Sequence, residues 1–295
     1  STSGSAHVSL FRTVAAFLSG LMVAAAALGF VVQQSLGDTA GFTARMDDAL
    51  ATPAVQEELN AAIRTEVTRA GDRLAQSVGP LGDLARSGAQ AAADQLGAAV
   101  QSDRFRAAWS QWCALLYTGL AEVAQGAPSS TVAVSGSNVT VAVGPLITPL
   151  VGDTLSGGAT GLLGTLGQST SVTLDTGIRL EQALQAAGTT ATYRWGLLVV
   201  ALLLLLVVVL PRGRRPLWAG WSLLWCAGCV SLIAYVTQRA PDAPSGDYPA
   251  IAGAVVGALT QPWVQPLTTL ALALAVLGGL TLVVGALRRP GRPAR

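Results

Sequence analysis

The amino-acid sequence predicts an integral membrane protein with four transmembrane α-helices, both ends in the cytoplasm, and a mostly helical α+β extracytoplasmic domain that contains a small β-hairpin or sheet. Three observations predict this fold class. Four long apolar runs are present, charge is segregated between the segments that separate them, and one of these segments has about 160 residues. A run of about 20 apolar residues crosses a bilayer as a helix, and a segment of about 160 residues is long enough for its own core.

The apolar runs divide the chain into alternating segments. Transmembrane helices are expected at residues 10–33, 195–211, 217–236 and 267–287. The remaining segments are a cytoplasmic N-terminus (1–9), the extracytoplasmic domain (34–194), a cytoplasmic turn (212–216), an extracytoplasmic loop with a short interfacial helix (237–266) and a basic cytoplasmic tail (288–295). The first run is longer than the apolar region of a usual signal peptide, so we expect an uncleaved signal anchor.

Charge fixes the expected orientation. The chain has 18 basic residues, all of them Arg, and all 16 acidic residues lie in the two segments expected outside. The inner segments carry no acid, and the arginines that determine topology are Arg12, Arg212, Arg214, Arg215, Arg288, Arg289 and Arg292. Because arginine excess near span ends marks the cytoplasmic side, both termini are predicted inside. With the richness in Ala, Gly, Val and Leu, the use of Arg alone is typical of a high-GC bacterium.

The long outer segment begins with four predicted helices. The first is a polar, helical stalk over residues 33–51. In the second, Thr52 is the expected cap and Pro53 the first residue, and Glu57 and Glu58 favour the positive end of the helix dipole. Further helices are expected over 81–100 and from Ser102. The last of these carries an aromatic and apolar stripe at helical spacing: Phe105, Trp109, Trp112 and Leu116.

The pattern then changes to the alternation of β-strands. Residues 131–134 and 139–143 flank a Ser-Gly-Ser-Asn turn and predict a hairpin, and residues 171–174 predict a third strand. Between them, the Gly-rich apolar stretch 145–167 is expected to form one or two short helices, and a helix over 178–187 leads into the second span.

Small residues in and near the spans predict close helix packing. In the second outer segment, residues 250–259 lie between prolines and are too few to cross a bilayer, so we expect a short interfacial helix. The spacing Gly253-x-x-x-Gly257 leaves open the alternative of a packed or re-entrant helix. The glycines expected at helix contacts are Gly228, Gly253, Gly257, Gly278 and Gly279.

Several kinds of chemistry are disfavoured by the residue inventory. The single histidine, His7, lies on the cytoplasmic side and no lysine exists, so no Ser-His-Asp or Ser-Lys arrangement can form in the outer domain. Cys113 is the one thiol there, which is a poor ligand set for zinc. The spans lack ionisable residues in their cores, unlike those of ion-coupled transporters. We therefore predict no enzyme, no cofactor, no metal site and, since the domain is net acidic, no nucleic-acid partner.

One motif favours an alternative. Cys226 and Cys229 form a C-x-x-C within the third span, which on a helix places both thiols on one face. With four spans, this spacing suggests a membrane thiol oxidoreductase of the vitamin K epoxide reductase type. The thiols lie near the middle of the span and no outer-loop cysteine pair accompanies them, so helix packing explains them better.

The layout resembles a group of uncharacterised four-span membrane proteins of actinobacteria. The resemblance rests on the phrase Leu50-Ala-Thr-Pro-Ala-Val-Gln-Glu-Glu-Leu59, the strand-rich stretch 138–149, the strand and helix 172–187 and the Arg-rich turn at 212–215. It implies a location in the cell envelope and supplies no activity, so no functional residue is carried over.

The leading hypothesis is a non-enzymatic protein of the bacterial plasma membrane, acting as an accessory, scaffold or assembly subunit of a larger membrane complex. Its expected partners are the lipid bilayer and other membrane-protein subunits. The thiol oxidoreductase is one alternative. The other is a module that binds lipid or envelope glycan through apolar surface on residues 145–167.

Overall fold

The computed structural model describes residues 3–35, 37–77, 82–99, 102–146, 171–209 and 215–287. The chain divides into two compact units. We call residues 1–37, 186–239 and 260–295 the span unit, and residues 38–185 and 240–259 the α+β unit.

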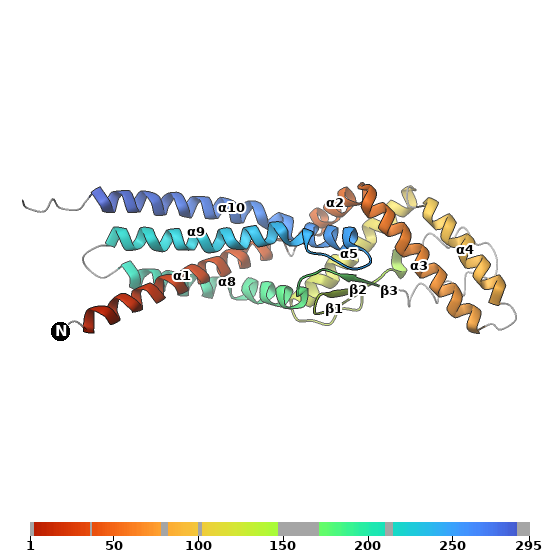
Figure 1. Ribbon diagram of the computed structural model, residues 1–295, viewed down its shortest axis with the longest axis horizontal. Helices are drawn as coiled ribbons and strands as arrows, with labels where there is room; N and C mark the ends of the chain where they lie inside the picture. The colour runs from red at the N-terminus through yellow and green to blue at the C-terminus, as the bar shows by residue number, and fades with distance from the viewer. Residues whose placement is uncertain are drawn as a thin grey trace, which may run out of the picture. The chain divides into compact units, whose positions relative to one another are not determined.

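The span unit is built on the four helices that the apolar runs predict. They are α1 (Ser3–Ser35), α8 (Leu180–Val209), α9 (Arg215–Arg239) and α10 (Pro249–Leu287). Each is long and apolar enough to cross a membrane, which confirms the expected number of candidate spans in the described chain (Figure 1). A multi-pass membrane protein follows from these four helices.

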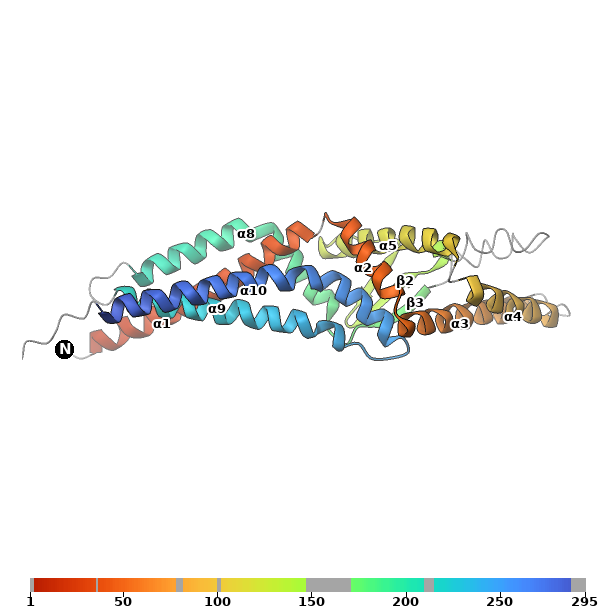
Figure 2. The same cartoon turned by 90° about the horizontal axis from the view of Figure 1, so that it is seen from above.

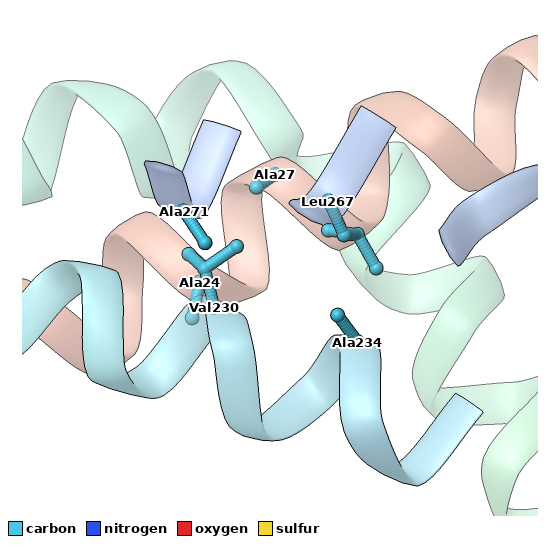
Figure 3. Close-up of a cluster of buried hydrophobic side chains, with 6 residues drawn as sticks. All are labelled: Ala24, Ala27, Val230, Ala234, Leu267 and Ala271. Atoms are coloured by element: carbon cyan, nitrogen blue, oxygen red, sulfur yellow. The ribbon is translucent and has the colours of Figure 1, made fainter. Parts of the chain in front are cut away.

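Small side chains let three of these helices approach one another. Ala24 and Ala27 of α1, Val230 and Ala234 of α9, and Leu267 and Ala271 of α10 form a buried cluster (Figure 3). Alanine at such positions lets backbones pack closely, which is how helices associate where lipid supplies no hydrophobic driving force. Gly29 of α1 has the same role toward α8, because a Cβ there would collide with the carbonyl of Thr190.

Four helices open the α+β unit: α2 (Thr39–Leu50), α3 (Pro53–Ser77), α4 (Gly82–Ala99) and α5 (Asp103–Ala124). They lie within a few residues of the predicted positions, and α3 packs along α4 (Figures 1 and 2). Ser102 caps α5, since its hydroxyl accepts from the Phe105 N–H at 3.1 Å. Thr52 differs from the prediction, because its hydroxyl donates to the Ala49 carbonyl at 2.7 Å and so closes α2.

The predicted hairpin and third strand form one antiparallel sheet in the order β1-β2-β3. The strands are β1 (Val132–Ser135), β2 (Asn138–Ala142) and β3 (Ser171–Asp175). Gly136 adopts a positive φ of 63° in the turn between β1 and β2, a conformation that favours glycine. The indole N–H of Trp112 in α5 donates to the Ala142 carbonyl at 2.9 Å and so joins the helix to the sheet.

Two expectations have a different outcome. The separate interfacial helix at residues 250–259 is wrong, because these residues form the first part of α10, which continues through Pro262 and Pro266. The helices expected over 145–167 lie, from residue 147 onward, outside the described residues.

Candidate functional site

The structure describes only part of the predicted topology determinants. Arg12 lies in α1 and Arg215 begins α9. Arg212, Arg214, Arg288, Arg289 and Arg292 lie outside the described residues. The orientation of the chain therefore stays a prediction from sequence.

The thiols of the C-x-x-C lie on α9 with different accessibility. Cys226 is buried at 1% exposure and Cys229 is half-buried, and both are free thiols. The fully buried Ser19 of α1 donates its hydroxyl to the Ala201 carbonyl of α8 at 3.3 Å. The Cys226 thiol is thus buried, whereas a reactive thiol is at least partly exposed to its substrate.

The predicted packing glycines fall into two groups. A Cβ on Gly253 would lie 2.8 Å from the Pro241 carbonyl oxygen, and one on Gly278 would lie 3.0 Å from Leu224 Cγ, so both positions require close approach. Gly257 makes an ordinary contact, at 3.5 Å from Pro241. Gly228 and Gly279 have no described atom within 4 Å of their Cβ positions.

Two charged side chains of the α+β unit bind the backbone of α10. The Glu58 carboxylate, on α3, accepts from the N–H groups of Ala250 and Ile251, both at 2.9 Å. The Arg45 guanidinium, on α2, donates through Nε to the Ala258 carbonyl at 2.9 Å. We call these two interactions the α10 clamp. The Glu58 carboxylate at the first N–H groups of α10 complements the positive end of the helix dipole.

Sequence reasoning missed the clamp. It assigned Glu58 to the dipole of its own helix and gave Arg45 no role. The clamp joins residues that are 192 to 213 positions apart in the chain, so no local pattern encodes it. Pro262 nevertheless indicates that a donor is needed. A proline within a helix leaves the carbonyl four residues earlier, here that of Ala258, without its usual backbone donor.

The core of the α+β unit contains a small apolar cavity of about 30 Å³. Its walls come from α3, α5, the sheet and α10, and include Leu59, Trp109, Val141, Leu174 and Ile251. A lipid chain occupies far more space than this, so the cavity is a gap in a well-filled core. Glu66 also lines it and is nearly buried, and its carboxylate is paired with Arg69.

Cys113 lies in the same core at 0% exposure. Burial raises the pKa of its thiol, and the negative charge of Asp47 raises it further. A thiol held in the protonated form is a poor nucleophile and a poor metal ligand. Within the described residues, no three His, Cys, Asp or Glu side chains gather as a metal site.

The acidic pairs of the sequence have distinct positions. Asp47 and Asp48 are exposed on α2, and partial burial together with the charge of Asp48 raises the pKa of Asp47. Glu57 is exposed while its neighbour Glu58 points to α10. These carboxylates are therefore not brought together as a general acid and base.

No protein family, no curated protein and no solved structure matches the chain.

Proposed function

We propose that the chain is a non-enzymatic protein of the bacterial plasma membrane, with its α+β unit outside the cytoplasm, and that it acts as an accessory or scaffold subunit of a larger membrane complex. The observation that carries the proposal is the α10 clamp. Both oxygens of Glu58 and the Nε of Arg45 hold the protein's own backbone at 2.9 Å. Because Glu58 and Arg45 bind the protein's own backbone, their charges stabilise the fold of the α+β unit.

The surface of the span unit supports a role in assembly. On α10, Gly278 packs against α9, whereas Gly279 and, on α9, Gly228 face open space. Large apolar side chains surround these positions, and Leu272 and Leu280 are more than half exposed. A glycine on an apolar helix face lets another helix approach closely, as at interfaces between membrane helices.

The test is co-purification of the tagged full-length protein in mild detergent after brief cross-linking. We expect discrete protein partners in fixed stoichiometry with the wild type, and weaker recovery of them with Gly279→Leu. Gly88→Leu, on α4, is the matched control, because a Cβ at Gly88 also meets no described atom within 4 Å. Lipid alone in the purified sample, with no protein partner, would contradict the proposal.

The same preparation separates the oxidoreductase alternative. Cys226→Ala with Cys229→Ala should leave folding and partner recovery unchanged, because the thiols act in helix packing. A disulfide between the two residues in the isolated protein, or a mixed disulfide with another protein, would replace the scaffold proposal with a redox one.

A further inference from the structure

Pro262 lies inside α10 and interrupts its hydrogen bonds. In a regular helix the N–H of residue 262 would donate to the carbonyl of Ala258, but proline has no N–H and its ring crowds that carbonyl. A buried backbone carbonyl without a donor is destabilising. The helix nevertheless continues from Pro249 to Leu287.

Arg45 supplies a donor to this same carbonyl. Its Nε lies 2.9 Å from the Ala258 oxygen, and a charged donor makes a stronger hydrogen bond than a neutral one. The guanidinium is oriented by Asp38, whose Oδ2 lies 3.7 Å from Arg45 Nη2. Asp38 is itself fixed, because its Oδ1 accepts from the N–H of Gly41 at the start of α2. The donor is thus held toward α10 by a second charged group.

The first part of α10 is therefore capped at both ends by charged side chains of the α+β unit. Glu58 accepts from the N–H groups at its start, and Arg45 donates to the carbonyl at residue 258. This is how a short independent helix is capped, with negative charge at its N-terminus and positive charge at its C-terminus. All the side chains and backbone groups involved belong to the α+β unit.

We propose that Pro262 divides α10 into two hydrogen-bonded segments and that Arg45 is the latch that closes the first segment, by supplying the donor that the Ala258 carbonyl lacks. With the latch closed, the Ala258 carbonyl has its donor from Arg45. With the latch open, that carbonyl loses its donor and the backbone hydrogen bonds around residues 258–264 open more readily. This inference goes beyond the scaffold function and holds whether or not the chain has a partner subunit.

A double-mutant cycle on the full-length protein in detergent tests the latch. Pro262→Ala restores the backbone donor to Ala258, so it makes Arg45 dispensable at that carbonyl. We expect Arg45→Met to speed amide exchange around residues 258–264 by about tenfold when Pro262 is present, from the loss of one charge-assisted hydrogen bond. In the Pro262→Ala background, Arg45→Met should change the same exchange rates by less than about threefold.

Arg64→Met is the matched control. Arg64 is also paired with an aspartate, at 3.5 Å from Asp94, but both side chains are more than half exposed. It should leave the exchange of α10 unchanged in both backgrounds. If Arg45→Met unfolds the protein, recovery of folding by Pro262→Ala supports the latch. An equal effect of Arg45→Met in both backgrounds, or none in either, would overturn it.

Discussion

Burial raises the pKa of individual ionisable side chains in the α+β unit. Cys113 is the clearest case, because full burial and the charge of Asp47 both raise the pKa of its thiol. Tyr117 behaves alike, since burial raises its pKa and the charge of Asp38 adds to this, while Arg45 opposes it. Such groups stay protonated near neutral pH and serve as packing residues.

The pKa of Cys113 gives a prediction with a definite sign. An unfolded cysteine ionises near pH 8.5, whereas the folded thiol stays protonated well above that value. Stability from Cys113 is therefore fully present below about pH 8.5 and falls as pH rises beyond it. The melting temperature of the wild type should decline more steeply between about pH 8 and 10 than that of Cys113→Ala. Parallel pH profiles would show that folding does not raise the pKa of the Cys113 thiol.

Glu58 gives a second prediction at the residue scale. Glu58→Gln keeps the shape of the side chain but removes one acceptor and the negative charge at the start of α10. Because hydrogen bonds to charged groups contribute about 1.5–3 kcal/mol, we expect a loss of stability of that order. The measurement is thermal unfolding of the full-length protein. Glu57→Gln, an exposed neighbour, is the control and should change stability little. Equal losses in the two variants would show that Glu58 acts only through general charge.

At the scale of elements, α5 organises the core of the α+β unit. Phe105, Trp109 and Leu116 are almost fully buried on one face, and the Trp109 ring lies 5.1 Å from that of Trp112. The sequence predicted this stripe from spacing alone, because helical periodicity is a local property. The structure shows that it is a packed surface.

The stripe predicts a large effect of truncation. Trp109→Ala removes a fully buried aromatic ring and should cost about 3–5 kcal/mol, a large part of the stability of a typical domain. Thermal unfolding in detergent should show a sharply lower transition, whereas Leu115→Ala, at a partly exposed position on the same helix, should shift it slightly. Unchanged stability together with loss of a partner would instead identify the stripe as a docking surface.

The prediction that failed at this scale concerned α10. A proline is normally evidence for the end of a helix, so residues 250–259 were expected to form a helix of their own. The rule is local, whereas the group that compensates for Pro262 is Arg45, far away in the chain. Helix periods, caps and strand alternation could be predicted because they depend on residues that are neighbours in the sequence. The α10 clamp could not be predicted, because it joins residues that only the folded structure brings together.

At the scale of the whole molecule, charge is divided between the two units. All 16 acidic residues belong to the α+β unit and none to the span unit, which has only arginines among its charged residues. The proposed orientation follows from the arginines at one end of the spans, which are Arg12, those at 212–215 and those at 288–295, because arginine excess near span ends marks the cytoplasmic side. The scaffold proposal depends on this orientation, because the side of the membrane on which the α+β unit lies decides which partner proteins it can bind.

The most direct test of the account is therefore the sidedness of the α+β unit in living cells. In a Cys-free protein, a single cysteine is placed at one of three positions. These are Ser87 on α4, Ser245 in the segment before α10, and Gly213 between α8 and α9 in the sequence. A thiol reagent that does not cross the plasma membrane should label the cysteines at positions 87 and 245 in intact cells, and the one at 213 only after permeabilisation. Labelling at 213 but not at 87 in intact cells would contradict the account.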